Sequence, residues 1–116
     1  MNKLILTVAL SSVASIAYAG SGIASWYGPG FHGKRTASGQ VYNQHALTTA
    51  CHRGLKLGTQ LKVTNVKNGK SVVVVCNDRG AFDKKYGRVL DLSKGAFSRI
   101  ASTSQGVIRV KYEVIK

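Results

Sequence analysis

Hydrophobic and polar residues alternate most regularly near the C-terminal end of the chain. Apolar and charged residues take turns there at successive positions: Ile108, Arg109, Val110, Lys111, Tyr112, Glu113 and Val114. A period of two is typical of a strand with one buried face and one solvent-exposed face. The pattern predicts a β-strand from Val107 to Val114, with Glu113 in a solvated cross-strand ion pair.

Two runs rich in β-branched residues, Gln60–Val66 and Ser71–Asn77, lie close together in the middle of the chain. The Asn68-Gly69 pair between them is the strongest short-range signal for a β-hairpin, so we expect these runs to pair in antiparallel fashion. Residues 72–75 are four consecutive valines. Such a run, without alternation, is typical of a central strand buried on both faces.

Three further segments complete the predicted architecture. Gly22–Tyr27 is expected to be a first strand, and residues 28–44 a long irregular loop rich in Gly, Ser, Thr and Asn, of the kind that is usually functional. Ser93–Ala101 should form a short helix, capped by Ser93 and with one apolar stripe. Five or six short strands with one or two short helices indicate a mainly β fold, a small closed barrel.

The N-terminal segment has the features of a secretory signal peptide. Lys3 precedes an apolar run, Leu4–Ala17, and the small-residue sequence Ala17-Tyr18-Ala19 follows. That run is too short to span a membrane, and no cysteine directly follows it as a lipid-anchor site. We therefore expect residues 1–19 to be removed and residues 20–116 to form one domain, exported to a periplasm or the extracellular medium as a monomer without a membrane anchor.

Cys51 and Cys76 are the only cysteines. An even pair in an exported chain favours a disulfide, which would stabilise so small a domain. Two buried free thiols are an alternative. A Cys–His metal site with His52 is a weaker one, because this spacing matches no usual zinc site. We predict neither a metal nor a cofactor.

The formal net charge of +13 falls to +12 when Lys3 leaves with the signal. A field of this size selects anionic partners, which outside a cytoplasm are wall polymers and phospholipid headgroups before nucleic acid. The charge can also serve solubility alone. No aromatic and basic strand motif for RNA bases is present, so nucleic acid is not expected as a partner.

The chain has only four carboxylates: Asp78, Asp83, Asp91 and Glu113. Asp83 precedes two lysines and is interpreted as surface charge. Asp78 follows the valine run and Asn77, where the strand is expected to end, and Asp91 lies between two leucines. An acid flanked by apolar residues at the end of an element can have a raised pKa and act as a general acid. The structural alternatives are an Asx turn at Asp78 and a helix cap at Asp91.

Eight short motifs then follow one another in the order found in the rare lipoprotein A (RlpA) family. They are Ser25-Trp26-Tyr27-Gly28, Gly30-Phe31-His32-Gly33, Thr36-Ala37-Ser38-Gly39, Ala46-Leu47-Thr48, Leu57-Gly58-Thr59, Val63-Thr64-Asn65, Asn77-Asp78-Arg79-Gly80 and Asp91-Leu92-Ser93. The resemblance covers essentially the whole chain after the signal. It implies a six-stranded double-psi β-barrel, shared with expansins and barwin-like proteins. It also implies lytic transglycosylase activity on peptidoglycan strands that lack stem peptides.

The resemblance implies roles for individual residues as well. Asp78 matches the family's Asn-Asp-Arg-Gly motif and is the first candidate for a single acid/base. Asp91 resembles the essential aspartate of expansin-like barrels and is the second candidate. Family members carry an acidic residue where this chain has Gln40, so we expect Gln40 to orient substrate. One carboxyl group can suffice, because a hydroxyl group of the muramic acid itself replaces water as the nucleophile.

Other polar and aromatic residues near the loop are candidates for contacts with the glycan: Trp26, Tyr27, His32, Thr36, Gln40, His45 and Arg79. For the aromatic pair a place in the core is equally open, and for His32 a structural role. Cationic residues would steer an anionic polymer to the groove: Lys34, Arg35, Arg53, Lys56, Lys84, Lys85 and Arg88.

Three functions are thus open from the sequence. The first is an endolytic peptidoglycan lytic transglycosylase acting on naked glycan strands. The second is a non-catalytic, expansin-like module that binds peptidoglycan, which the glutamine at position 40 favours. The third is a cationic barwin-like protein that binds nucleic acid or damages competitors.

Overall fold

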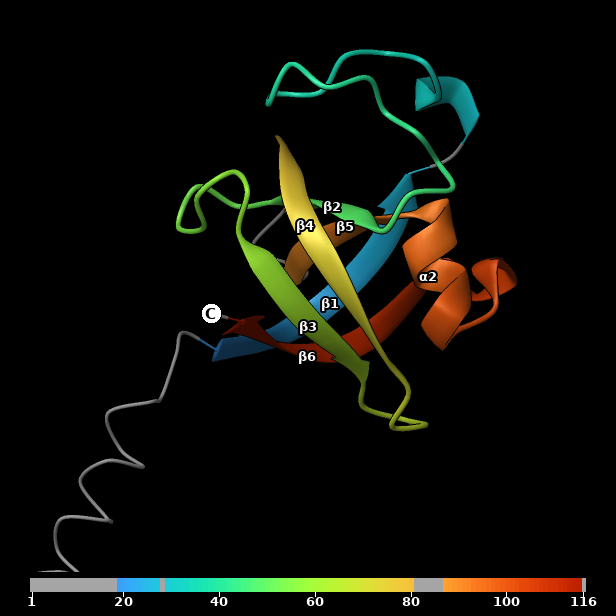
Figure 1. Cartoon of the computed structure of the whole chain (residues 1–116). Helices are drawn as coiled ribbons and strands as arrows, with labels where there is room; N and C mark the ends of the chain where they lie inside the picture. Colours follow the sequence, from blue (N-terminus) through green and yellow to red (C-terminus); the bar gives the residue numbers. More distant parts are fainter. Residues whose placement is uncertain (1–18, 28, 81–86, 116) are drawn as a thin grey trace, which may run out of the picture.

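Six strands close into a barrel in the computed structural model, which describes residues 19–27, 29–80 and 87–115. The strands are β1 (Ala19–Tyr27), β2 (Thr48–Cys51), β3 (Gln60–Asn65), β4 (Ser71–Arg79), β5 (Arg88–Ser93) and β6 (Val107–Ile115). Their order around the barrel is β1-β5-β2-β4-β3-β6 (Figure 1). Within these ranges the chain also forms one α-helix, α2 (Lys94–Ile100), and two single-turn 3-10 helices, η1 (Pro29–Phe31) and η3 (Thr103–Gln105). The predicted mainly β, six-stranded barrel is confirmed.

The barrel is mixed in strand direction. β1 runs parallel to β5, and β2 runs parallel to β4, whereas the other four neighbouring pairs are antiparallel. The predicted hairpin is present as β3 and β4, paired from Gln60 opposite Val75 to Thr64 opposite Ser71. The partners of each parallel pair are separated in the chain by at least one other strand, as crossover connections require. The loop between β1 and β2 and helix α2 between β5 and β6 connect strands that are not neighbours in the barrel.

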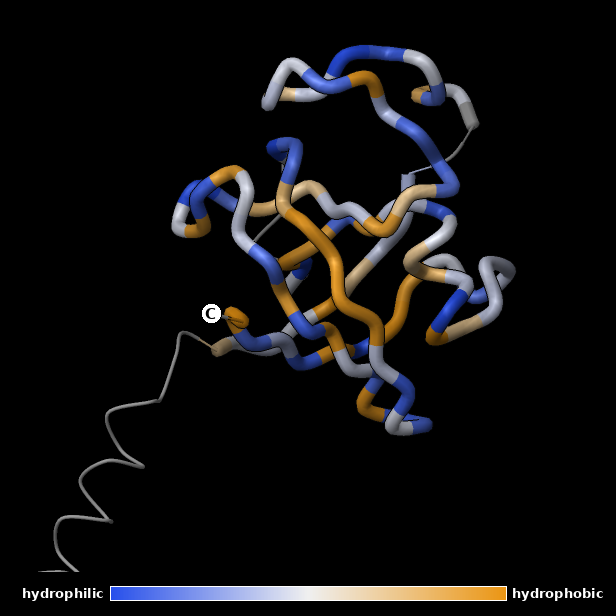
Figure 2. The backbone as a smooth tube through the Cα atoms, in the orientation of Figure 1, coloured by the Kyte–Doolittle hydropathy of each residue, from blue (hydrophilic) through white to orange (hydrophobic). Residues whose placement is uncertain are grey.

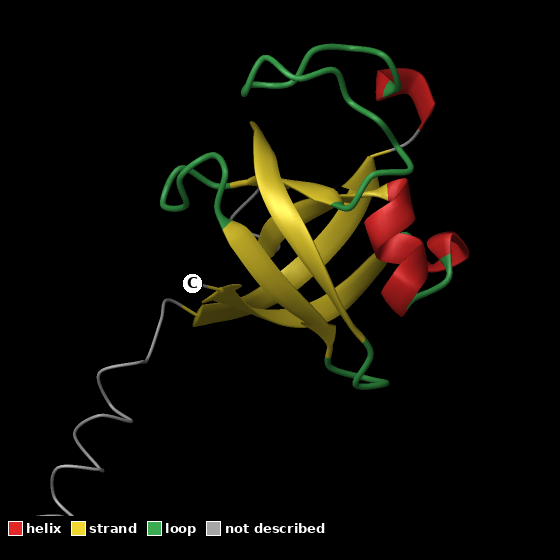
Figure 3. Cartoon of the chain, in the orientation of Figure 1, coloured by secondary structure: helices red, strands yellow, loops and turns green. Residues whose placement is uncertain are grey.

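The core lies inside the barrel and beneath α2. Inward-facing residues of every strand are buried there: Ala24, Cys51, Leu61, Val63, Val72, Val74, Cys76, Leu90, Leu92, Ile108, Val110 and Tyr112. Ser93 caps α2 by accepting a hydrogen bond from the Ala96 backbone N–H (3.1 Å). Phe97 and Ile100 of that helix are fully buried. The helix thereby closes one side of the barrel (Figure 3), as the apolar stripe predicted.

The prediction that residues 72–75 are buried on both faces is wrong. Val72 and Val74 are buried, but Val73 between them is 46% exposed. A closed barrel turns one face of each strand inward, and no other element covers the outer side chain of Val73. The predicted strand 107–114 does alternate as expected, with Ile108, Val110 and Tyr112 buried.

Two strands, β2 and β5, were not predicted from the sequence. Both are short, with four and six residues, and both mix polar with apolar residues. Other predictions fall outside the described residues: residues 1–18 of the predicted signal peptide, which was expected to span residues 1–19, and Asp83, Lys84 and Lys85 in the segment 81–86. The predicted domain boundary at residue 20 is not tested. Within the described ranges, no helix is long and apolar enough to cross a membrane.

The predicted disulfide is confirmed. Cys51 of β2 and Cys76 of β4 are bonded, with their Cα atoms 5.8 Å apart, and both residues are fully buried. This bond rules out both the free-thiol and the cysteine–histidine metal alternatives. Because β2 and β4 are neighbours, the disulfide joins two strands that also carry candidate site residues.

Candidate functional site

Four residues form a row across the outer face of four neighbouring strands. Ser25 of β1 pairs with Asp91 of β5, Asp91 pairs with Ala50 of β2, and Ala50 pairs with Asp78 of β4. Residues paired on adjacent strands point to the same face of a sheet. The two candidate acids, remote in sequence, are therefore brought to one surface. We call Ser25, Asp91, Ala50 and Asp78 the acid row.

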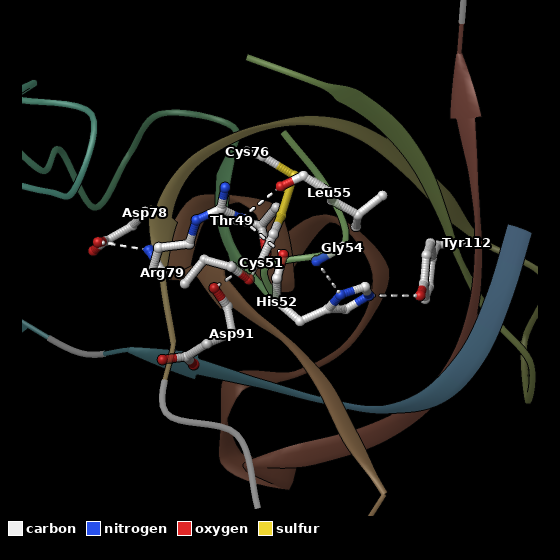
Figure 4. Close-up of a disulfide and its surroundings, with 11 residues drawn as sticks. Thr49, Cys51, His52, Gly54, Leu55, Cys76, Asp78, Arg79, Asp91 and Tyr112 are labelled. Atoms are coloured by element: carbon white, nitrogen blue, oxygen red, sulfur yellow. Dashed lines mark hydrogen bonds between the residues drawn. A yellow bond between two sulfur atoms is a disulfide. The ribbon is translucent and has the colours of Figure 1, made fainter. Parts of the chain in front are cut away.

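The acid row faces away from the barrel interior. Figure 4 shows Asp78 and Asp91 on the same side of the Cys51–Cys76 disulfide, with both carboxyl groups directed away from it. Two strand spacings separate their Cα atoms, which corresponds to about 10 Å. The alanine between them carries only a methyl group, and it is 3% exposed. Only this small side chain therefore lies between the two carboxyl groups on the outer face.

Asp91 is half-buried, and its environment raises its pKa. Burial is the main cause, because removal from water disfavours the charged form. A hydrogen bond from the Ser25 hydroxyl to Oδ1 (3.0 Å) and the positive charge of Arg88 lower the pKa in part, while the negative charge of Asp78 raises it further. Asp91 therefore holds a proton at a higher pH than an ordinary aspartic acid does.

Asp78 has a different environment, dominated by backbone hydrogen bonds. Its Oδ1 atom accepts from the Ala37 N–H (2.9 Å) and from the Arg79 N–H (2.8 Å). The Arg79 guanidinium group does not bind this carboxylate. It extends to the other side of the strand, where Nη1 donates to the carbonyl groups of His52 and Leu55 (Figure 4). Asp78 thus fastens the long loop to the barrel and is not locked in an ion pair with Arg79.

The loop over residues 29–47 arches above the end of the barrel at which β1 and β4 end (Figure 1). Its tip is a tight turn, in which the Thr36 N–H and hydroxyl both donate to the Gln40 carbonyl group (2.8 and 3.0 Å). The Ser38 N–H donates to the Asn77 carbonyl group (3.2 Å). Figure 2 shows that most of this loop is hydrophilic. The loop forms a polar wall beside Asp78.

Gln40 and Thr36 lie in this turn. The Gln40 Oε1 atom is within 3.4 Å of the Ser38 hydroxyl and of the Asn77 side-chain amide, both of which can donate to it. Gln40 is exposed next to the acid row. This position is compatible with the predicted role of Gln40 in orienting substrate, which stays a prediction. Thr36 is 8% exposed and fastens the turn. A direct contact of Thr36 with substrate stays a prediction.

Tyr27 lies beneath the loop and is 7% exposed. Its ring stacks on Tyr42 (4.1 Å between centroids) and meets the edge of Phe31 (5.9 Å). Burial raises the pKa of the Tyr27 hydroxyl, and Tyr42, Asp78 and Asp91 add to the rise. Tyr27 is therefore neutral over the whole physiological range. Phe31, with 54% exposure, offers more aromatic surface to a sugar than Tyr27 does.

Trp26 and His32 hold structural contacts. The Trp26 ring packs near Phe97 of α2 (6.3 Å), its Nε1–H donates to the Thr103 carbonyl group (3.1 Å), and the partly buried side chain lies against the core. His32 Nδ1 accepts from the Gln44 N–H (3.2 Å), and its ring lies 6.0 Å from that of His45. The predicted contacts of Trp26, His32 and Arg79 with substrate stay predictions.

Two members of the acid row were not assigned roles from the sequence. Ser25 belongs to a motif that was noted, but its hydrogen bond to Asp91 joins residues 66 positions apart. Ala50 gave no signal at all. Arg88 was expected only to steer substrate. Its Nη2 atom also donates to the Ser25 hydroxyl (2.8 Å), and its charge acts on Asp91.

No group of three or more metal-binding side chains occurs in the part of the chain that the structure describes.

The lytic transglycolase family model matches residues 19–112. A probable endolytic peptidoglycan transglycosylase RlpA of Synechocystis sp. is 54% identical over 105 residues, which are 90% of this chain and 32% of that protein. The endolytic peptidoglycan transglycosylase RlpA of Campylobacter jejuni is 51% identical over 104 residues, which are 90% of this chain and 37% of that protein. The chain thus spans about a third of the length of these relatives.

Solved structures support the fold. A Streptomyces papain inhibitor is similar with a TM-score of 0.69 and 19% identity, over 88% of this chain and 98% of that one. A mutant expansin of Clavibacter michiganensis in complex with cellohexaose is similar with a TM-score of 0.67 and 22% identity, over 85% of this chain and 51% of that one. At these identities the likeness establishes the barrel alone.

Proposed function

Because the chain belongs to the RlpA family of double-psi β-barrel lytic transglycosylases, we propose that its barrel cleaves the glycan strands of peptidoglycan that lack stem peptides, with Asp91 as the acid. One observation carries the proposal. Asp91, with a raised pKa, lies half-buried on the outer face of the barrel, two strands from the half-buried carboxyl group of Asp78. The names of the relatives support the reaction class, although they describe proteins of which this chain spans about a third.

The first step is protonation of the glycosidic oxygen by Asp91. The bond between this oxygen and C1 of the muramic acid residue breaks as the oxygen takes the proton, and positive charge develops on C1 and the ring oxygen. Burial keeps the Asp91 proton available, and the Ser25 hydrogen bond fixes the carboxyl group in place. The negative Asp78, on the other side of Ala50, would favour the developing positive charge.

The second step uses the carboxylate that the first step leaves. Asp91 removes the proton from a hydroxyl group of the same muramic acid residue while the oxygen bonds to C1, which closes an anhydro ring and restores the acid. An attack within one sugar residue needs no bound water and gains the advantage of proximity. Only one carboxyl group changes its protonation state in this cycle. A glutamine at position 40 is therefore compatible with catalysis.

The sequence favoured Asp78 as the acid/base, and the structure supports the other candidate. Asp78 Oδ1 already accepts two backbone hydrogen bonds, one of which fastens the loop tip. We propose that Asp78 positions this loop and contributes negative charge, while Asp91 transfers the proton. Gln40 and the exposed ring of Phe31 lie on the loop that Asp78 fastens to the barrel. Both would contact the sugar chain.

Peptidoglycan as the substrate places the protein outside the cytoplasm, and the disulfide fits that location. The net charge of +12 that the domain keeps without Lys3 would attract this anionic polymer. A second candidate function is binding without cleavage, as the sequence analysis considered. The observation in its favour is Gln40, which offers no acidic group at a position where the family has one.

Digestion of purified, denuded glycan strands tests the proposal. We expect the wild-type protein to release fragments that end in anhydromuramic acid, identified by mass spectrometry. Asp91→Asn should lower the rate by at least about 100-fold, the typical contribution of a general acid, while Asp78→Asn should retain more activity. Binding of the strands without any product would replace the enzyme proposal by the binding function.

A further inference from the structure

A second feature of the outer surface lies beside the acid row. A pocket of about 290 Å³ is lined by Gly22, Ile23, Arg88, Val89 and Arg109, among others. The register places Arg88 of β5 and Arg109 of β6 on either side of Ile23 of β1. Paired residues share a face of the sheet, so both arginines lie on the same outer face as Ile23. We call this the arginine pocket.

The arginine pocket carries positive charge without a carboxylate among its lining residues. Arg109 is exposed, and Arg88 is half-buried. Arg88 is held by its hydrogen bond to Ser25 (2.8 Å), yet its Nε atom is buried and makes no hydrogen bond among the described residues. Buried polar groups nearly always have a partner. A small shift of the side chain toward an incoming oxygen atom would give this N–H an acceptor.

The arginine pocket is contiguous with the acid row. Ile23 and Ser25 are two positions apart on β1 and face the same side, which is a separation of about 7 Å along the strand. Arg88 touches both features, since it lines the pocket and binds the Ser25 hydroxyl. When the scissile bond of a glycan strand lies at Asp91, the adjacent part of the strand would lie over the two arginines. A substituent on a sugar ring next to the scissile bond would then reach them.

We propose that the arginine pocket binds the lactyl carboxylate of a muramic acid residue and so selects strands in which this group is free. This inference rests on the proposed function. In a strand with stem peptides the same carboxyl group is an amide, which has no negative charge and carries a bulky chain. Guanidinium groups bind carboxylates through paired, charge-assisted hydrogen bonds, and they gain little from an amide. The pocket thus supplies a physical reason for a preference for denuded glycan.

The test compares two forms of one substrate. Denuded strands with free lactyl carboxylates are assayed beside the same strands after the carboxylates have been converted to neutral methylamides. We expect the wild-type protein to cleave the free form with a kcat/KM at least about tenfold higher. Arg109→Gln should lose most of this preference through a higher KM for the free form, with the methylamide form unaffected.

Lys111→Gln is the matched control. It removes the same charge from the same exposed face of β6, but Lys111 lies outside the arginine pocket. The control should retain the preference. Equal cleavage of both forms by the wild-type protein, or equal losses in the two variants, would overturn the inference.

The readout also separates this inference from the proposed function. If the wild-type protein cleaves neither form, the proposed function fails, and binding of the uncut strands is measured instead by calorimetry. Tighter binding of the free form that Arg109→Gln abolishes and Lys111→Gln retains would still support the carboxylate site. Equal binding of both forms would overturn it.

Discussion

The Ser25 hydroxyl has two partners of opposite charge. It donates a hydrogen bond to the Asp91 carboxyl group and accepts one from Arg88. Burial raises the pKa of Asp91 and is the larger effect, whereas the hydrogen bond from Ser25 lowers this pKa. A single hydroxyl group thus moderates the acidity of the group that we assign to proton transfer.

Ser25→Ala tests this moderation. Loss of the hydrogen bond removes a contribution that lowers the pKa of Asp91, so the pKa should rise further. Since Asp91 must be protonated to act, the high-pH limb of the kcat/KM profile should move to higher pH. Ser71→Ala, a change at an exposed serine of β4, is the control and should leave the profile in place. A limb that moves to lower pH, or not at all, argues against Ser25 as a positioning residue.

Asp91 should also weaken the fold at neutral pH. A pKa raised in the folded state means that this state binds the proton more tightly than the unfolded chain does. The associated stability is complete below the unfolded pKa of about 4 and is lost as pH rises through the folded pKa. Asp91→Asn cannot ionise. We expect its melting temperature to equal that of the wild type near pH 3 and to exceed it at pH 7.

Calorimetric melting curves over this pH range check the expectation. A variant that is less stable than the wild type at pH 7 would show that the Asp91 carboxylate is stabilised by its surroundings, contrary to the account. The outcome is independent of any substrate.

At the scale of single residues, the sequence identified both aspartates because acids are scarce, and because Asp91 lies between two leucines while Asp78 lies at the end of an apolar run. It did not identify the role of Ser25, since the partner is 66 positions away. Only the register of β1 against β5 brings the two together. The role of Ala50 likewise depends on its position between β4 and β5, which only the tertiary structure sets.

Among the elements, the loop over residues 29–47 depends on β4 for its position. The Asp78 Oδ1 atom accepts the Ala37 N–H, and the Asn77 carbonyl group accepts the Ser38 N–H. These contacts tie the loop tip to the end of a strand. The position of the loop is thereby fixed by the side chain of a residue in the acid row.

Two substitutions at Asp78 separate this anchoring from its charge. Asp78→Asn keeps a carbonyl oxygen that can accept both backbone hydrogen bonds, whereas Asp78→Ala removes them. We expect hydrogen exchange at residues 36–40 to be at least about tenfold faster in the alanine variant, the effect of losing roughly 1.5 kcal/mol, and nearly unchanged in the asparagine variant. Equal exchange in both variants would mean that the loop does not rely on this side chain.

The disulfide joins the two strands that carry Ala50 and Asp78. Replacement of both cysteines by alanine, Cys51→Ala with Cys76→Ala, should lower the free energy of unfolding by about 3 kcal/mol, because the unfolded chain is no longer cross-linked over 25 positions. The melting temperature should fall by more than about 10 °C. Reducing agent should have the same effect on the wild type and none on the variant. Unchanged melting would show that the disulfide does not stabilise the barrel.

The elements that the sequence revealed are those with strong local signals. The hairpin of β3 and β4 has Asn68-Gly69 at its turn, and α2 has both a cap and an apolar stripe. β2 and β5 lack such signals, since they are short and are specified by their neighbours. The burial of residues 72–75 was mispredicted because four valines give no local sign of which face is inward.

At the scale of the whole molecule, the barrel brings three features to one outer surface: the acid row, the loop that borders it, and the arginine pocket. The family motifs pointed to this fold, because eight of them occur in register. The arrangement of charge on the surface depends on how the strands close, which no local pattern contains.

The central claim is that Asp91 cleaves the glycan through attack by the sugar's own hydroxyl group. Digestion of denuded strands in water enriched in oxygen-18, followed by mass spectrometry of the new chain ends, tests it most directly. We expect anhydromuramic acid ends without the label, and their loss in Asp91→Asn. Ends that carry oxygen-18 would show that water is the nucleophile and would contradict the account.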